Sequence, residues 1–271
     1  MTRRQTMKKV LFAALLMAGT FVYAQTVEEI LTVFTDNDRV PDHNYTVLSL
    51  ENIDANGKIE KLECHQFGGG DNDLKNVVFD FKAPANMKGT RVLQAQKKGK
   101  DDDRWIYLPE LRSTRRIPSS EKNKSFVGTE FIYDDLNLRE PHEDKSEFVS
   151  ESQKWSNGPQ TFECWVIKST PIKKGEVNYS YRISYFDKKT YIPVYIEFFD
   201  AKDRLVKTQT CNKLEMVKGE TGIEYPLRRQ NTIENKLTKR KTVVTVLKFV
   251  FDKEVPKSYF TQNYLVTGKA K

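Results

Sequence analysis

The sequence DRWIYLPELRSTRRIPSSEKNKSFVGTEFIYDD, residues 103–135, decides the fold of this chain. Its first part alternates between large apolar side chains and predicts a short strand, with Trp105 and Tyr107 on the same face. Pro109 ends that strand, because proline has no backbone N–H to donate to a sheet. The stretch therefore begins as a strand whose aromatic side chains share one face.

A basic segment then separates this strand from a second apolar cluster. The segment carries Arg112, Arg115 and Arg116, and the cluster that follows includes Phe126 and Phe131. Arginine binds carboxylate or phosphate through paired donors. Two aromatic clusters joined by a cationic loop therefore predict a pocket for an apolar body with an anionic or polar head. Two interpretations of the arginines stay open, a rim that binds a head group or docks a partner, and a set of salt bridges within the loop.

Segments with a period of two residues surround this stretch on both sides and predict strands. These segments are residues 45–50, 58–64, 77–81, 91–95, 147–155, 161–168, 176–186, 191–199, 204–216, 223–231 and 242–251. The Asn56-Gly57 pair between the first two supplies the positive φ angles that a tight hairpin needs. No connection between them is long enough for a crossover helix, so they predict one large antiparallel meander.

Helical patterns are few. Residues 26–37 predict an amphipathic helix that Thr26 caps, and residues 129–137 are a second candidate. The apolar faces of the later strands are too wide for one helix of this length to cover. Part of the apolar surface therefore lines a cavity, or else the chain folds as a closed two-sheet sandwich with every aromatic side chain in its core.

The N-terminus predicts an export signal. Four basic residues precede the apolar segment 10–22, and the small side chain of Ala24 suits cleavage after that residue. An uncleaved anchor is the alternative, although the apolar segment is short for a membrane span. We expect residues 25–271 to form a single domain in the periplasm.

The composition argues against several classes of function. The net charge is +8, and about +4 remains without the first 24 residues, which is too little to indicate nucleic-acid binding. The three histidines lack metal-ligand spacing, and no serine lies in a nucleophile motif, so we expect no catalytic residue, metal or cofactor. The three cysteines are expected to be buried free thiols, with a disulfide between two of them as the alternative.

Two motifs in the opening stretch carry a resemblance to a known family. RWIYLPELRSTRRI and SFVGTEFIYDDL resemble the signature of the outer membrane lipoprotein-sorting protein-like family, within the LolA/LolB-like lipoprotein carrier superfamily. Residues 84–94 upstream of the motifs and residues 185–208 downstream of them also fall in the order that this family has. The resemblance implies a mainly β fold, a large antiparallel half-barrel wrapped over one to three helices. It also implies an apolar cavity for acyl chains, and binding without catalysis.

These observations predict a periplasmic carrier that binds acyl chains of a lipid or lipoprotein and transfers them to or from the outer membrane or a membrane exporter. An exporter of the resistance-nodulation-division type is implied by the resemblance alone, and we expect a monomer. The alternative is a lipid-sensing regulatory or interaction protein of the cell envelope. We expect Arg112, Arg115 and Arg116 at the rim. The predicted ligand-binding residues are Trp105, Tyr107, Phe131, Tyr179, Tyr181, Ile196, Phe198, Leu247 and Phe249.

Overall fold

A computed structural model of the chain describes residues 25–35, 41–71, 74–97, 102–136, 139–173, 175 and 177–270. Thirteen strands within these residues form one sheet, in the spatial order β6-β5-β4-β3-β2-β1-β13-β12-β11-β10-β9-β8-β7. Every neighbouring pair is antiparallel. The expected mainly β antiparallel sheet is confirmed, but it is not one continuous meander, because β1 pairs with β13 and the strands run outward from there in two series. The predicted signal peptide, residues 1–24, lies outside the described residues.

The first and last strands meet in the middle of the sheet, because β1 (Asn44–Ile53) pairs with both β2 and β13 (Lys241–Phe251). The other strands are β2 (Ile59–Asp71), β3 (Leu74–Ala83), β4 (Arg91–Ala95), β5 (Asp103–Leu108), β6 (Ser113–Ile117), β7 (Asp144–Asn157), β8 (Gln160–Pro171), β9 (Tyr181–Asp187), β10 (Pro193–Phe199), β11 (Leu205–Lys218) and β12 (Glu224–Asn235). The consecutive strands β6 and β7 therefore lie at opposite edges, and the chain between them crosses the sheet.

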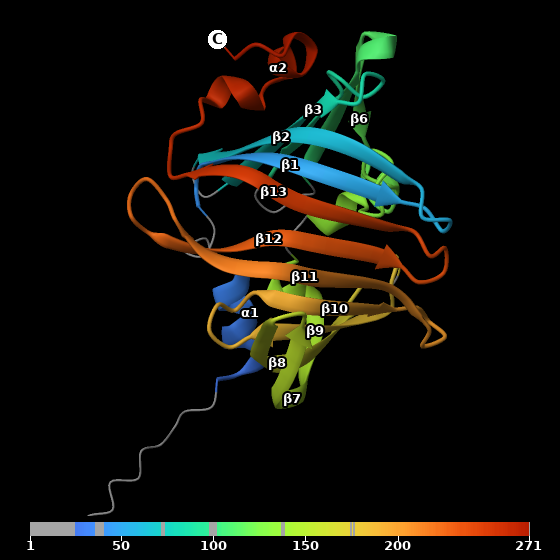
Figure 1. The fold of residues 1–271 in the computed structure, drawn as a ribbon, viewed down its shortest axis with the longest axis vertical. Coiled ribbons are helices and arrows are strands. Elements are labelled where there is room, and N and C mark those ends of the chain that lie inside the picture. The colour runs from blue at the N-terminus through green and yellow to red at the C-terminus, as the bar shows by residue number, and fades with distance from the viewer. Residues whose placement is uncertain are drawn as a thin grey trace, which may run out of the picture.

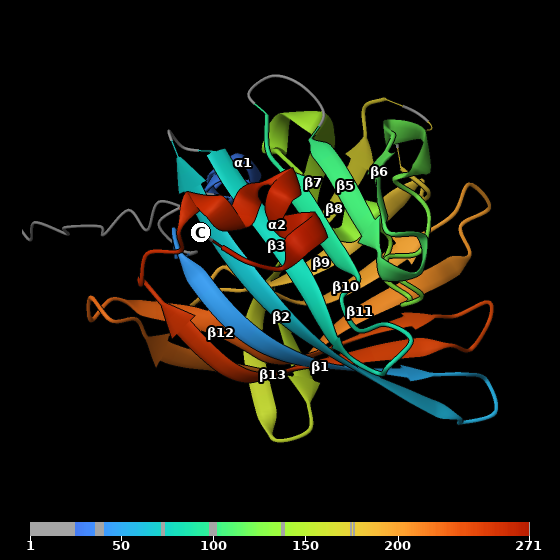
Figure 2. The ribbon, with the colours of Figure 1, turned by 90° about the horizontal axis from the view of Figure 1, so that it is seen from above.

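The sheet curls into an open half-barrel (Figures 1 and 2). The tip of the β7–β8 hairpin bends back onto β11, three places away from β8 in the sheet. There the Gln160 amide donates to the Leu214 carbonyl at 2.8 Å and accepts from the Leu214 N–H at 2.9 Å. These two bonds close one end of the curved sheet.

Two elements occupy the concave face. The first is α1 (Val27–Thr35), which begins as predicted with Thr26 and Glu29 in a capping box. The second is residues 118–136 of the β6–β7 connection, which we call the insert. The helix predicted within the insert is observed only as a short 3₁₀ turn, Tyr133–Leu136.

The insert fills one half of the concave face. Phe126 packs edge-on against Phe79 of β3, with ring centroids 5.0 Å apart, and against Tyr133 at 5.6 Å. The sheet residues buried in this cluster are Leu48, Leu50, Leu62, Cys64, Phe79, Phe81, Val92, Ile106, Ile117 and Val246. Helix α1 covers the other half, where Ile30 and Leu31 pack on Ile167 and Phe186.

The C-terminal helix α2 (Gln262–Thr267) lies on the convex face, against β3 and β4 (Figure 2). Tyr264 donates a hydrogen bond to the buried carboxylate of Asp80 at 3.2 Å, and Arg91 donates to the Leu265 carbonyl at 2.9 Å. None of the described helices is long and apolar enough to cross a membrane. The three cysteines are free and buried, as predicted.

Candidate functional site

The concave face holds two adjoining hollows that share Tyr179 and Phe198. We call them the inner cavity, about 90 Å³, and the outer hollow, about 610 Å³. The inner cavity lies between α1, the end of the insert and strands β9 to β12. The outer hollow lies between the insert and the β10–β12 region, and most of its lining is polar.

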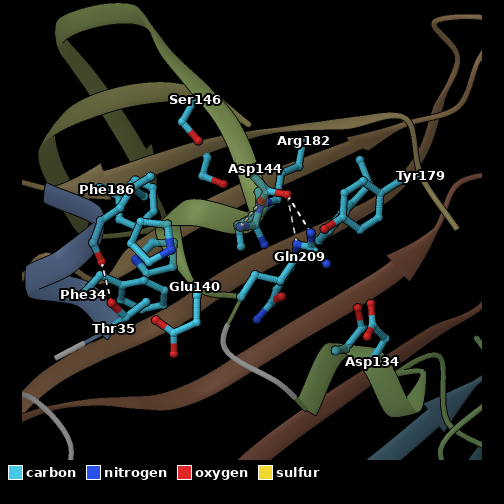
Figure 3. A pocket seen from close by; sticks show the side chains of 18 of the residues that line it. Phe34, Thr35, Asp134, Glu140, Asp144, Ser146, Tyr179, Arg182, Phe186 and Gln209 are labelled. Atoms are coloured by element: carbon cyan, nitrogen blue, oxygen red, sulfur yellow. Dashed lines mark hydrogen bonds and ion pairs between the residues drawn. The ribbon is translucent and has the colours of Figure 1, made fainter. Parts of the chain in front are cut away.

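One wall of the inner cavity is apolar. Leu31 and Phe34 reach it from α1, and Phe186, Ile196 and Phe198 reach it from β9 and β10 (Figure 3). The strand residues among them face the same space because residues 182, 184 and 186 of β9 pair with residues 198, 196 and 193 of β10. These side chains therefore share the concave face. The aliphatic and aromatic carbons here suit the tail of an amphiphile.

The opposite wall is an ion cluster centred on the buried Asp144 (Figure 3). Its carboxylate accepts hydrogen bonds from Arg139 at 3.0 Å and from Arg182 at 3.1 Å. Burial acts to lower the pKa of Arg139, but the hydrogen bond and charge of Asp144 more than offset it and the pKa is raised. One carboxylate therefore balances two guanidinium groups.

Two further titratable groups line the cavity. Burial raises the pKa of Asp134, and Lys122 and Arg139 only partly oppose this effect. Burial likewise raises the pKa of the Tyr179 hydroxyl, so that group is a neutral donor at physiological pH. Among the described residues no cluster of three His, Cys, Asp or Glu side chains is placed to hold a metal ion.

Polar contacts anchor the insert to the sheet beside the outer hollow. The backbone N–H of Glu130 donates to Thr242 of β13 at 2.9 Å, and Thr242 donates to Asn52 of β1 at 2.7 Å. The Glu130 carboxylate pairs with Arg240 at 2.8 Å. The insert is thus attached to the concave face through a few polar links as well as through its aromatic side chains.

The structure places five of the nine predicted ligand-binding residues on the concave side. Ile196, Phe198 and Tyr179 line the hollows, and Phe131 and Phe249 pack against the cluster beneath the insert. Tyr179 precedes β9, which begins at Tyr181 and not at residue 176 as expected. Whether these residues bind a ligand stays a prediction.

The other four side chains face outward, which corrects the predicted faces. Trp105 and Tyr107 pack in the cluster with α2, while Ile106 faces the concave side. Tyr181 stacks on Phe199, with ring centroids 4.8 Å apart, away from the inward-facing residues 182, 184 and 186. Because adjacent side chains of a strand point to opposite faces, an error of one residue reverses the whole set.

The fourth, Leu247, is 58% exposed. The pairing of β13 with β1 skips it, since Val246 lies opposite Leu48 and Lys248 lies opposite Val47. This β-bulge inserts one extra residue and breaks the alternation that placed Leu247 on the same face as Phe249.

The rim arginines are exposed at the edge of the sheet. Arg115 pairs with Glu121 at 2.8 Å, and Arg116 pairs with Asp103. Arg112 adopts a left-handed conformation, with φ of 47°, after the turn at Pro109. For Arg115 and Arg116 the structure shows the salt-bridge interpretation.

Sequence reasoning missed the polar residues of the inner cavity. Asp144, Arg182 and Gln209 occupy inward positions of β7, β9 and β11, and Arg228 reaches the cavity from β12. The available signal was the alternation of β9 itself, in which Arg182 and Ser184 precede Phe186 on one face. The aromatic side chains predict that the face of Tyr181 points inward, whereas the structure turns the opposite face, with Arg182 and Ser184, toward the cavity.

Comparison with known proteins gives matches to solved structures. A DUF1329 family protein from Desulfovibrio piger is 25% identical, with a TM-score of 0.75, and the match covers 87% of this chain and 96% of that chain. A putative outer membrane lipoprotein-sorting protein domain from Vibrio parahaemolyticus is 23% identical, with a TM-score of 0.74, and the match covers 87% and 97%. A LolA superfamily protein from Nitrosomonas europaea is 18% identical, with a TM-score of 0.62, and the match covers 89% and 100%.

A search among curated proteins gave no match. A family model described as an uncharacterised protein matches residues 73–267, which is most of the chain. These residues run from the start of β3 to the end of α2, and so include the lining of the outer hollow and all of the inner cavity except the side chains from α1. The predicted resemblance is confirmed in the fold, which the LolA superfamily protein shares, and the chain belongs to the family of this model, the DUF1329 family.

Proposed function

We propose that the protein is a non-enzymatic carrier of the periplasm that binds acyl chains of a lipid or lipoprotein on the concave face of the half-barrel. In this proposal it transfers them to or from the outer membrane, or to a membrane exporter of the resistance-nodulation-division type, and acts as a monomer. The fold that the chain shares with the LolA superfamily protein supports this role.

The main support for the proposal is that two short elements, and not a second sheet, cover the apolar concave face of the sheet. This apolar face extends over strands β1 to β6 and β13, where the insert covers it, and over β8 and β9, where α1 covers it in place of a second sheet. An acyl chain that replaced one of these elements would bury its methylenes at about 0.8 kcal/mol each. The same surface then serves as a core when empty and as a binding site when loaded.

The two hollows are too small or too polar to hold an acyl chain as they are, so binding requires a movement of the protein. The inner cavity, about 90 Å³, is smaller than the roughly 300 Å³ of the smallest typical ligand pockets. The outer hollow is larger, but polar side chains such as Asn178 and Lys207 line it. An acyl chain therefore enters between Phe198 and the insert, and the insert or α1 shifts to admit it.

The test is the binding of a fluorescent long-chain fatty acid to the wild-type protein and to the variants Phe198→Glu and Phe199→Glu. Phe198 lines both hollows and is 4% exposed, whereas the neighbouring Phe199 stacks on Tyr181 outside the cavity. A buried carboxylate opposes an apolar ligand, so Phe198→Glu is expected to weaken binding at least about tenfold. Phe199→Glu is the matched control and is expected to bind like the wild type, with both variants shown to be folded by circular dichroism.

Two results would reject the proposal. One is a wild-type protein that does not bind the fatty acid. The other is an equal effect of both variants, because the binding would then not involve the concave face.

A further inference from the structure

The inner cavity contains a cation that lacks a partner. Arg228 of β12 lines the cavity, yet it forms no hydrogen bond or ion pair with any residue that the structure describes. Its one electrostatic neighbour is the Cys211 thiol, whose own pKa is raised by burial, so the thiol is neutral. Burial lowers the pKa of Arg228, and no carboxylate among the described residues opposes this effect.

Arg229, the next residue of β12, does have partners within the protein. Arg229 donates to Glu215 at 2.6 Å and to the Val246 carbonyl at 2.9 Å, and its guanidinium lies 5.0 Å from the ring of Phe249. One arginine of the pair is therefore satisfied by the protein, while the other is directed to the cavity without a counter-ion.

The carboxyl groups of the same lining do not supply that counter-ion. Asp144 is engaged by Arg139 and Arg182, and Asp135 is engaged by Lys207. Glu140 is exposed and accepts a hydrogen bond from the backbone of Glu143. The remaining carboxyl is Asp134, whose charged neighbours are Lys122, Arg139, Asp135 and Arg104 and do not include Arg228.

Neutral donors without partners line the same space. The Gln209 amide reaches between the Asp144 cluster and Asp134 (Figure 3), and it forms no hydrogen bond with the residues that the structure describes. The same holds for the Tyr179 hydroxyl. A guanidinium group, an amide and a hydroxyl are the groups that bind the oxygens of a phosphate or carboxylate.

We infer that the inner cavity is an anion subsite in which Arg228, assisted by Gln209 and Tyr179, binds the phosphate or carboxylate head of an amphiphile. This inference rests on the proposed carrier function and specifies its cargo. The apolar wall of Phe34, Phe186 and Ile196 contacts the first carbons of the tail, and the tail continues past Phe198 under the insert. The cargo therefore enters head first.

The test compares fluorescent dodecyl chains that differ only in their head group, a carboxylate, a phosphate monoester, a primary alcohol or a trimethylammonium group. A charge-assisted hydrogen bond in a partly buried site favours the anionic heads over the alcohol by about 10- to 100-fold in Kd. In Arg228→Gln we expect that preference to disappear, with binding of the alcohol unchanged. Arg228→Lys is expected to retain part of it. Arg204→Gln, at an exposed hairpin, is the matched control and keeps the full preference.

The outcomes separate the two claims. If no chain binds, whatever its head, the carrier function fails and the head-group inference fails with it. If all heads bind equally, or Arg228→Gln weakens every chain alike, the carrier function stands and the subsite is rejected. Inorganic phosphate is added as a competitor, and we expect it to displace the probes only weakly. Displacement as strong as that by the alkyl phosphate would show a site for free anions and would reject the amphiphile.

Discussion

The Nζ of Lys207 on β11 lies 2.6 and 2.9 Å from the two carboxylate oxygens of Asp135 in the insert, and both side chains are largely buried. One of these oxygens also accepts a hydrogen bond from the Ile132 N–H at 2.8 Å. The ammonium group lies 4.6 Å from the ring centroid of Phe198. This ion pair attaches the insert to β11 beside the two hollows.

Removing this ion pair is expected to destabilise the packing of the insert on the sheet. Lys207→Met leaves a buried carboxylate without its cation, and we expect the free energy of unfolding to fall by about 3 to 5 kcal/mol. Urea denaturation measures the loss, and hydrogen exchange is expected to increase first in residues 118–136. Arg204→Met removes an exposed pair with Asp200 and is expected to cost clearly less than Lys207→Met. Equal losses in the two variants would contradict the anchoring role.

Asp134 is expected to make the folded protein less stable as pH rises. Burial raises the pKa of this carboxyl above its ordinary value of 3.8, so the folded state binds more protons than the unfolded state between the two values. Stability therefore falls as pH rises through this interval, and the loss remains at neutral pH.

The neutral variant Asp134→Asn isolates this contribution. We expect it to be more stable than the wild type at neutral pH and to lose that advantage below the ordinary pKa of 3.8. Thermal melts of both proteins across this pH range measure the difference. An advantage that stayed constant with pH would show that the substitution acts by packing and not by charge.

The three thiols are expected to be unreactive in the folded protein. Burial raises the pKa of Cys164 to about 12 and also raises the pKa of Cys64 and Cys211. The thiolate is the reactive form, so alkylation by iodoacetamide at mildly alkaline pH should modify none of them before unfolding and all of them in urea. Rapid modification of one thiol in the native state would place that cysteine at the surface.

Two adjacent residues of α2 test the role of the C-terminal helix. Leu265 is fully buried against the convex face, whereas Val266 is 48% exposed. Leu265→Ala is expected to lower the free energy of unfolding by about 2 to 5 kcal/mol, and Val266→Ala by no more than about 0.5 kcal/mol. Similar small effects of both substitutions in urea denaturation would mean that α2 does not stabilise the sheet.

Local signals in the sequence were sufficient for the overall fold. Thr26 caps α1 as predicted, and Gly57 has the predicted positive φ, 85°, in the first hairpin, whereas Asn56 does not adopt a positive φ. The antiparallel strands could be predicted because each strand is marked by the alternation of its own residues and by the turn residues next to it. The half-barrel curvature came from the family resemblance, since no local pattern encodes how far a sheet bends.

The site was harder to predict because it depends on which face of each strand is inward. The bulge at Leu247 reverses the alternation within β13, and nothing in that strand marks it. The ion pair of Asp144 with Arg182 joins β7 to β9 across 38 residues of sequence. Arg228 stands out only when its lack of a partner is known, and that requires the three-dimensional structure.

Native mass spectrometry of the protein purified from the periplasm, with organic extraction of any bound molecule, tests the carrier function most directly. We predict a nearly stoichiometric adduct that yields an amphiphile with an acyl chain and an anionic head, and its loss in Phe198→Glu. A ligand-free mass from a folded protein that also fails to take up a fluorescent fatty acid would contradict the account. The concave aromatic side chains would then serve only as a core.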